Sequence, residues 1–253
     1  MGFKGLLAGL KLKLGLPAMI NNVRLYNFQD FLYYRNLLNR GIKVESRKDK
    51  EFVARWLNFK IIAPWQCSTL INDFEKTYGF IDYHNKKVLD IGGFIEDTAL
   101  YFVHKGAKYV IVYEPIFCNY LEKNVKLNNL CNRVKILCKG VGLKEGSVKI
   151  GVNSVHPEAS GLKLGENKIE IEPVSEVLKR HNVDIAKFDC ESCEYFLISV
   201  PCEILRKIPD YIIEYHGSSV PLIHKFEECN FKLKKVMAFH DTAIGIGLLY
   251  FTL

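Results

Sequence analysis

Acidic side chains stand at the ends of several short apolar segments that have the composition of buried strands. Asp90 ends a segment that begins at Lys87, and the turn after it contains Gly92 and Gly93. Glu114 ends the next apolar segment, 24 residues after Asp90. Glycines let a backbone approach a ligand closely, and a carboxylate at this spacing is typical of a group that binds a ribose diol. The spacing therefore predicts a cofactor that contains a nucleoside.

The position of Asp90 separates two classes of cofactor. A dinucleotide would bring its pyrophosphate to the turn after the first strand, where the carboxylate of Asp90 would repel it. S-adenosylmethionine carries an ammonium and a sulfonium group, and a carboxylate attracts both. We therefore expect S-adenosylmethionine as the cofactor, with Glu114 at its ribose.

A second acidic cluster follows the two apolar segments near the middle and the end of the chain. Asp189, Glu191 and Glu194 follow one segment, and Glu214 and His216 end the other. Histidine ordinarily titrates near neutrality, so His216 is a candidate general base, while a strand-end imidazole bonded to the backbone is an equally good interpretation. Asp189 and Glu191 could orient or deprotonate an acceptor hydroxyl. With His216 they could also hold a divalent cation, but a fourth ligand is not evident and no metal site is predicted.

The elements that must position these residues alternate between strand and helix after His84. This alternation predicts an α/β fold with a mostly parallel sheet covered on both faces, whose ligand lies at the carboxyl ends of the strands. The expected strands are 87–90, 109–114, 134–138, 185–189 and 211–215, and the expected helices are 98–105, 115–129, 175–180 and one that ends at 229. Segments 147–152 and 168–173 predict a small antiparallel insertion, and 231–238 with 243–251 a closing hairpin.

Residues 1–83 are expected to form a helical N-terminal cap on a domain that spans 84–253. The sequence favours a helix over 22–38, a charged linker over 40–50, and either a helix or a strand pair over 51–66. In the first 17 residues leucines recur at helical spacing beside lysines. Such a segment either packs on its own domain or makes a peripheral contact with a membrane surface.

Four motifs together resemble a known family. The chain contains, in order, VLDIGGFIEDTALYF, VYEP, KFDCESCE and IIEYHG. These motifs are similar to those of the FkbM-like branch of class I S-adenosylmethionine-dependent methyltransferases, over about residues 84–235. The resemblance implies a Rossmann-like seven-stranded sheet with an antiparallel last strand. It also implies O-methylation of a hydroxyl on a sugar, a glycolipid or another small molecule.

The resemblance also implies roles for individual residues. The turn after the first strand would hold the methionine end of the cofactor, Glu114 the ribose and Gly140 with Val141 the adenine, while Asp189 and Glu191 would face the reaction centre. The implied cofactor-binding positions are Asp90, Ile91, Gly92, Gly93, Asp97, Thr98, Glu114, Pro115, Gly140 and Val141.

Two positions depart from the family pattern, which has glycine at both. A Glu96 carboxylate about 4 Å from the carboxylate of the cofactor would weaken binding by about three decades, unless it points away or pairs with the ammonium. Ser192 is expected to be accommodated without strain. Glu96 therefore supports one alternative, a methyltransferase-like binding protein with an impaired cofactor site.

The amino-acid composition narrows the classes of protein to which the chain can belong. Apolar residues make up 49% and charged residues 25% of the 253 residues, which predicts a packed globular domain and excludes disordered and collagen-like chains. The net charge of +7 would suit an RNA methyltransferase. The acidic Asp189 and Glu191 stand where RNA amino-methylating enzymes generally carry a Pro-Pro-aromatic motif, so nucleic acid is not the expected acceptor.

The eight cysteines are scattered through the chain, and only Cys190 and Cys193 form a Cys-X-X-Cys pair. A second pair at zinc spacing is missing, so the pair is interpreted as two packed thiols. We expect reduced cysteines and a cytoplasmic location, where residues 1–17 either pack on their own domain or contact a membrane surface.

Overall fold

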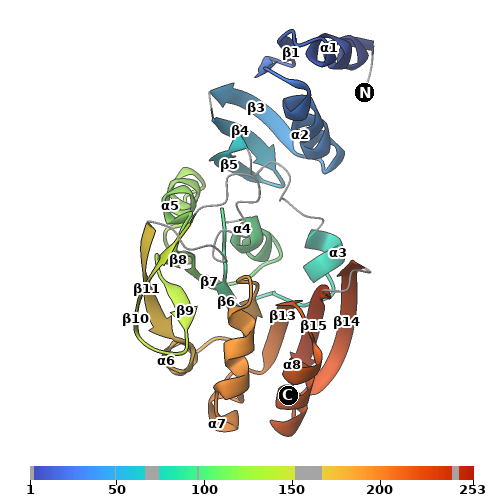
Figure 1. The fold of residues 1–253 in the computed structure, drawn as a ribbon. Coiled ribbons are helices and arrows are strands. Elements are labelled where there is room, and N and C mark those ends of the chain that lie inside the picture. Colours follow the sequence, from blue (N-terminus) through green and yellow to red (C-terminus); the bar gives the residue numbers. More distant parts are fainter. Residues whose placement is uncertain (1–2, 49, 66–73, 96, 152–166, 241–244) are drawn as a thin grey trace.

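A computed structural model describes residues 3–48, 50–65, 74–95, 97–151, 167–240 and 245–253 (Figure 1). The chain forms a larger α/β part and an N-terminal cap, which stands over one end of it with the N-terminus at the far end. Among the helices described, none is long and apolar enough to span a membrane.

The α/β part is built on one seven-stranded sheet. Its strands are β6 (Lys87–Ile91), β7 (Tyr109–Tyr113), β8 (Val134–Leu137), β12 (Ile185–Phe188), β13 (Asp210–His216), β14 (Lys232–His240) and β15 (Ile246–Thr252). Their spatial order is β14-β15-β13-β12-β6-β7-β8. Strands β6, β7, β8, β12 and β13 are parallel to their neighbours among these, whereas β15 is antiparallel to both β13 and β14. The predicted sheet with an antiparallel last strand is confirmed.

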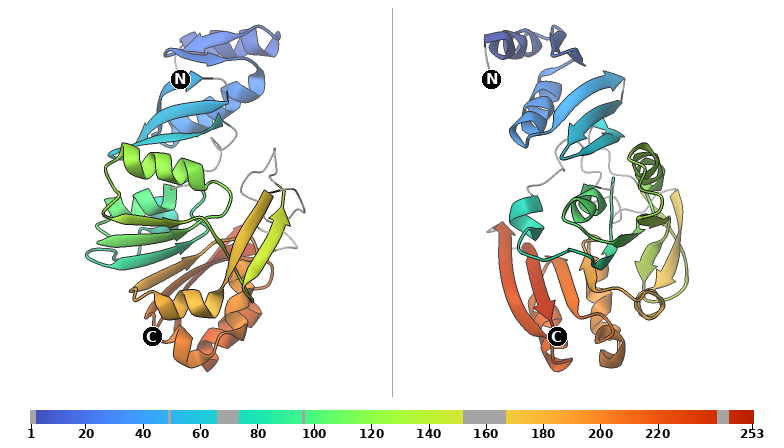
Figure 2. Two further views of the ribbon diagram at one scale, coloured as in Figure 1. Left: turned by 90° about the vertical axis from the view of Figure 1, so that its left-hand side faces the viewer. Right: turned by 180° about the vertical axis from the view of Figure 1, so that it is seen from behind.

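Helices cover both faces of this sheet (Figure 2). They are α4 (Asp97–His104), α5 (Cys118–Leu127), α6 (Val174–Arg180), α7 (Cys202–Leu205) and α8 (Val220–Glu228), with the 3-10 helix η3 (Cys193–Ser199). Successive strand residues alternate between two cores: Val88 belongs to the core with α4 and α5, and Leu89 to the core with α6, α7 and α8. Because both faces are buried, the strands are continuous apolar runs, which made them visible in the sequence.

A small sheet is inserted after β8. It contains β9 (Gly140–Gly142), β10 (Gly146–Ile150) and β11 (Asn167–Pro173) in the order β10-β11-β9. The antiparallel pairing of β10 with β11 was predicted, whereas the parallel pairing of β9 with β11 was not. Strand β9 matters for the site because it carries Gly140 and Val141.

The cap is not purely helical, which corrects the sequence interpretation. Its elements are α1 (Phe3–Lys13), β1 (Ala18–Ile20), β2 (Val23–Leu25), α2 (Phe28–Asn39), β3 (Lys43–Lys48), β4 (Glu51–Trp56), β5 (Phe59–Pro64) and α3 (Phe74–Tyr78). Strand β3 occupies most of the segment that was expected to be a linker. Its charged side chains are partly or fully exposed and Val44 is its buried residue, so its composition resembles that of a loop. The ambiguous segment is a strand pair, and α2 begins only at Phe28 because Asn27 caps it.

Two asparagines, Asn124 in α5 and Asn128 directly after it, attach the cap to the α/β part. The Asn128 amide accepts a hydrogen bond from the Lys60 N–H at 2.8 Å and donates to its carbonyl at 2.7 Å. Asn124 does the same at Ile62, at 2.8 and 3.0 Å. Each amide thus pairs with β5 as a neighbouring strand would, and this satisfies an otherwise open sheet edge. A single core continues from the cap to the α4 and α5 face of the sheet, and the boundary at residue 83 stays a prediction.

Candidate functional site

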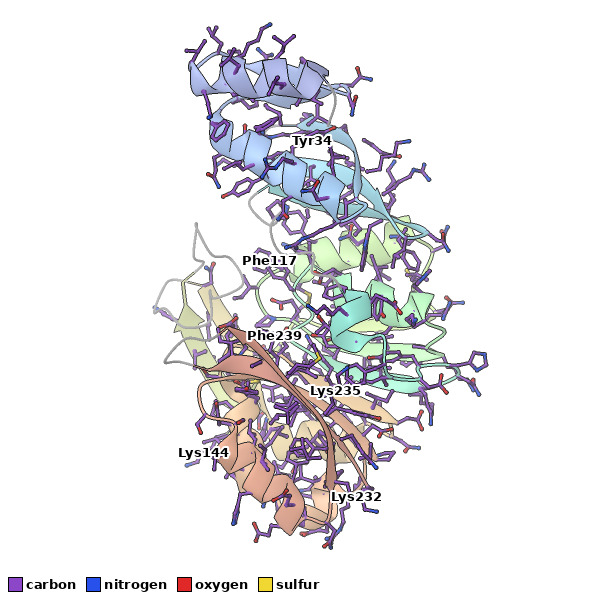
Figure 3. All side chains as sticks on the ribbon, turned by 90° about the vertical axis from the view of Figure 1, so that its right-hand side faces the viewer. Tyr34, Phe117, Lys144, Lys232, Lys235 and Phe239 are labelled. Atoms are coloured by element: carbon purple, nitrogen blue, oxygen red, sulfur yellow. A yellow bond between two sulfur atoms is a disulfide. The ribbon has the colours of Figure 1, made fainter. Side chains whose placement is uncertain are left out.

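A cleft of about 1590 Å³ lies at the carboxyl ends of β6, β7, β12 and β13. The sequence-predicted residues that line it are Ile91, Gly92, Asp97, Thr98, Glu114, Pro115, Gly140, Val141, Asp189, Glu191 and His216. Phe117 and Phe239, labelled in Figure 3, contribute apolar wall. The volume exceeds the roughly 300–1,000 Å³ of a usual small-molecule pocket. The cleft therefore has room for a cofactor and an acceptor together.

The turn after β6 needs its two glycines for packing. Gly92 has a φ of +84°, and a Cβ on it would lie 1.8 Å from the Asp189 carbonyl oxygen at the end of β12. A Cβ on Gly93 would lie 2.1 Å from a methyl carbon of Val112. Only Gly92 lines the cleft. The sequence predicted that these glycines let the backbone approach a ligand. In the structure they also let the turn approach the neighbouring strands.

Asp90 lies beneath the cleft and does not line it. Its side chain is fully buried, with one oxygen 3.0 Å from Lys187 Nζ and the other accepting a hydrogen bond from the Thr98 hydroxyl at 2.5 Å. Lys187 also donates to the Gly92 carbonyl at 2.8 Å. Because Asp90 is buried beneath the cleft, its carboxylate is not placed for the predicted contact with a ligand ammonium.

Lys187 is a site residue that the sequence analysis missed. Burial lowers the pKa of Lys187, but the carboxylates of Asp90 and Asp189 outweigh it and hold that pKa above its ordinary value, so the lysine is charged. It pairs directly opposite Asp90 in the register of β12 and β6. The available signal was a lysine inside an otherwise apolar strand, a position that is costly unless a partner compensates the charge.

Asp97, at the start of α4, lines the cleft, whereas Asp90 does not. Asp97 is 4% exposed and accepts a hydrogen bond from the Thr98 N–H at 3.1 Å. Burial raises its pKa to about 7, and the nearby Lys187 opposes this rise. Glu96, the departure from the family pattern, lies outside the described residues.

Glu114 closes the opposite side of the cleft at the end of β7. One carboxylate oxygen accepts the backbone N–H groups of Ile116 and Phe117 at 2.6 and 3.0 Å, and the other accepts that of Phe94 at 3.0 Å. Burial raises the pKa of Glu114, while these three hydrogen bonds lower it. A carboxylate has about four acceptor positions, so Glu114 is fixed in orientation and can still accept a hydrogen bond from a ligand hydroxyl.

The predicted catalytic residues do come together at the ends of β12 and β13. One ligand atom from each of Asp189, Glu191 and His216 lies within 4.8 Å of the other two. His216 Nε2 is 3.4 Å from Glu191 and 3.9 Å from Glu214, while Nδ1 is 3.2 Å from Glu194. The imidazole is therefore surrounded by carboxylates on both of its nitrogens.

Glu194 fixes the orientation of His216 and was not selected among the site residues from sequence. Glu194 is fully buried. One of its oxygens accepts a hydrogen bond from the His216 backbone N–H at 3.0 Å and lies 3.2 Å from the Nδ1 of the His216 ring. The other oxygen accepts the Ser192 N–H at 2.9 Å. With Nδ1 beside this buried carboxylate, Nε2 lies 3.4 Å from Glu191, which lines the cleft.

The surroundings of His216 correct the expectation of a near-neutral base. Burial lowers the pKa of His216, but the hydrogen bond to Glu194 and the charges of Glu191 and Asp189 prevail and raise it to about 9. Burial also raises the pKa of Glu214, and Asp189 adds to that rise. His216 is consequently protonated at neutral pH.

The turn that presents Glu191 contains two left-handed residues in succession. Glu191 has a φ of 56° and Ser192 a φ of 93°. A non-glycine residue at such a φ is strained, by an amount on the order of 1 kcal/mol or more. The expectation that Ser192 replaces a glycine without strain is therefore wrong.

Three disulfides correct the expectation of reduced thiols. They join Cys118 to Cys138, Cys190 to Cys193, and Cys202 to Cys229. Cys131 is exposed and unpaired, and Cys67 lies outside the described residues. Two of these pairs join residues far apart in sequence, and their proximity is set by the fold. The cytoplasmic location stays a prediction.

No protein-family model matches the chain, and no curated protein sequence matches it. Solved structures resemble it in fold. TYW2 from M. jannaschii in complex with AdoMet has a TM-score of 0.47 and 14% identity, over 81% of this chain and 86% of that one. The m1A22 tRNA methyltransferase TrmK from B. subtilis has a TM-score of 0.44 and 11% identity, over 68% and 62%. TrmK from M. capricolum with S-adenosyl-homocysteine has a TM-score of 0.41 and 16% identity, over 66% and 61%.

The chain thus spans less than two thirds of either TrmK structure. Similarity at these identities concerns the fold alone. At TM-scores below 0.5 it assigns this chain no role, and the α/β fold rests on the order and pairing of the seven strands of the central sheet. The chemistry is derived from the cleft.

Proposed function

We propose that this protein binds S-adenosylmethionine and transfers its methyl group to a hydroxyl of a small molecule or a glycan. The observation that carries the proposal is that one cleft joins Glu114, the Gly92 turn and the Asp189–Glu191–His216 cluster. The first two suit a nucleoside cofactor, and the third suits proton transfer from an acceptor. The FkbM-like motifs support the choice of a hydroxyl acceptor.

The charges in the cleft fit a cationic cofactor. Asp97, Asp189, Glu191 and Glu214 line the cleft near the strand ends, together with the cations Lys187 and His216, whereas the other cations of the lining, Arg40, Lys76, Lys139 and Lys144, come from other segments. Lys187 is compensated by the buried Asp90. Carboxylates near the strand ends attract an ammonium and a sulfonium group and repel phosphates. We assign the ammonium to Asp97 and the ribose hydroxyls to Glu114.

When bound, S-adenosylmethionine supplies an electrophilic methyl group on a positively charged sulfur. The chain must align the acceptor oxygen behind that methyl carbon and accept the hydroxyl proton. Asp189 and Glu191 expose 28% and 21% of their side chains, so both can accept a hydrogen bond from the hydroxyl and orient it. His216 Nε2 lies beside Glu191 and accepts the proton when the imidazole is neutral.

The high pKa of His216 sets the expected pH profile. Turnover should rise with pH up to about 9, because only the neutral imidazole accepts a proton. His216→Ala should remove that rise. Asp189→Asn and Glu191→Gln should lower turnover by about two to four decades and leave cofactor affinity nearly unchanged. Turnover should also persist in the presence of a chelator.

RNA is a second candidate acceptor, because basic side chains lie among the cleft residues. Lys76 and Lys144 are exposed and line the cleft, and Lys144 is labelled in Figure 3. Phosphates of a bound RNA would contact these lysines, while only a base would enter the acidic interior. RNA is therefore included among the acceptors to be tested.

Two measurements test the proposal. Calorimetric titration should detect binding of S-adenosylmethionine, and no heat at millimolar cofactor would overturn the proposal. Transfer of labelled methyl groups to a panel of sugars, glycolipids and RNA then identifies the acceptor class. Binding without transfer to any acceptor would instead favour the alternative of a methyltransferase-like binding protein.

A further inference from the structure

Helix α1 has two apolar faces, and only one of them is covered. Ala8 and Leu12 are buried, at 5% and 3% exposure, and the helix contacts α2 and β1. Gly9 permits this contact, because a Cβ there would lie 3.2 Å from the ring of Phe31 in α2. Burial of this face explains why the helix is attached to the cap.

The opposite face presents leucines to solvent. Leu6, Leu10 and Leu14 recur every four residues and are 71%, 58% and 71% exposed. Residues four apart lie above one another on a helix, and Leu14, directly after α1, continues the helical turn by donating its N–H to the Leu10 carbonyl at 3.2 Å. These side chains therefore form one stripe, and Leu7 borders it. Six of the sixteen exposed large apolar side chains in the described part of the chain lie between Leu6 and Met19. Figure 3 shows side chains of α1 pointing outward at the extreme end of the molecule.

Basic residues flank this stripe on both sides. At 3.6 residues per turn, Lys11 lies along one border of the stripe and Lys13 along the other. Lys13 Nζ is also 5.1 Å from the centre of the Phe28 ring. Asp30 is the first acidic residue of the chain, so the segment before it carries only positive side-chain charge. An apolar stripe between lysines and without carboxylates matches the boundary of an anionic bilayer.

We propose that α1 docks on an anionic membrane surface. The leucine stripe (Leu6, Leu7, Leu10 and Leu14) enters the boundary between head groups and acyl chains, and Lys11 and Lys13 contact the lipid phosphates. The covered face keeps the helix attached to α2, so the cap and the α/β part stay outside the bilayer. This docking goes beyond the proposed methyl transfer and does not depend on it, because α1 contributes no residue to the cleft.

Sedimentation of the full-length protein with lipid vesicles tests the docking. The protein should sediment with phosphatidylcholine vesicles that contain about one third phosphatidylserine, and much less with phosphatidylcholine alone. Leu6→Gln/Leu10→Gln/Leu14→Gln should weaken binding to the anionic vesicles by about a hundredfold or more, since it removes most of the stripe. Lys11→Gln/Lys13→Gln should weaken it by about fivefold per lysine, and high salt should do the same.

A matched control changes exposed apolar residues elsewhere. Val220→Gln/Val236→Gln replaces side chains that are 68% and 53% exposed, and it should leave sedimentation unchanged. Because all replaced leucines are exposed, thermal unfolding should show that every variant is folded. Equal sedimentation of the leucine variant and the wild type would overturn the docking. Pelleting without vesicles, or a dimer that the leucine variant abolishes, would overturn it in favour of contact between two copies.

Discussion

The sharpest prediction concerns Glu194, the buried carboxylate that holds His216. Replacing Glu194 by glutamine keeps the shape of the side chain and one acceptor oxygen, which can still accept the His216 N–H, while the amide NH2 faces the Ser192 N–H and the negative charge beside Nδ1 is removed. We expect the imidazole to stay in place and to lose part of its preference for the protonated form.

The magnitude follows from the surroundings of the imidazole. A rise of the His216 pKa from its ordinary 6.5 to about 9 corresponds to up to about 3 kcal/mol in favour of the imidazolium. Among the groups that raise it, the hydrogen bond to Glu194 ranks first, followed by the charges of Glu191 and Asp189. Glu194→Gln should therefore lower the pKa of His216 by about 1 to 2.

Two assays measure this change. Histidine ring resonances followed by NMR from about pH 5 to 10 report the His216 pKa directly, with His216→Asn assigning the signal among the seven histidines. Unfolding free energy reports it through linkage. Because the pKa of His216 is raised in the folded state, its stabilisation is complete below about pH 6.5 and is lost as the pH rises through about 9. In Glu194→Gln this loss should be smaller and should end nearer pH 7 to 8.

Glu191→Gln is the matched control, because it also removes a carboxylate beside the imidazole, but at 3.4 Å from Nε2 and with 21% of its side chain exposed. It should lower the pKa of His216 less than Glu194→Gln does. The reasoning is refuted if His216 of the wild type titrates near 6.5, or if Glu194→Gln leaves its midpoint near 9. If Glu194→Gln does not fold, the wild-type titration alone still decides.

Three further predictions concern the cofactor and the disulfides. The Kd for S-adenosylmethionine should fall as the pH rises through about 7, because ionised Asp97 attracts the ammonium. Asp97→Asn should remove this pH dependence. Calorimetry at about pH 6 and 8 measures it, and an equal Kd of the wild type at both would exclude Asp97 from the ammonium site. Glu114→Gln should raise that Kd by about 10- to 100-fold, and an unchanged Kd would exclude Glu114 from the ribose site. Cys202→Ser/Cys229→Ser should lower the free energy of unfolding in urea by about 3 kcal/mol, whereas Cys131→Ser should change it by less than about 0.5 kcal/mol. Equal effects of the two cysteine changes would argue against that disulfide.

The central sheet and the location of the site were determined by the sequence, for a local reason. Strands buried on both faces are continuous apolar runs, and in a parallel sheet their carboxyl ends meet at one edge. The positions of Asp189 and His216 along the chain were therefore enough to place them together, with Glu114 across the cleft from them. The cap was harder to interpret, because β3 buries few of its residues and its charges resemble those of a loop.

The choice of partners was decided only by the tertiary structure. Asp90 is one of several acidic residues at strand ends. Its charge is compensated by Lys187, because the register of β12 and β6 places the two residues opposite each other. Glu194, which lies in η3, raises the pKa of His216 at the end of β13. The disulfide from Cys118 to Cys138 depends on how α5 and β8 approach each other. Patterns along a chain report which positions are buried. Which charge meets which, and hence each pKa, depends on distances of a few ångströms between residues that are far apart in sequence.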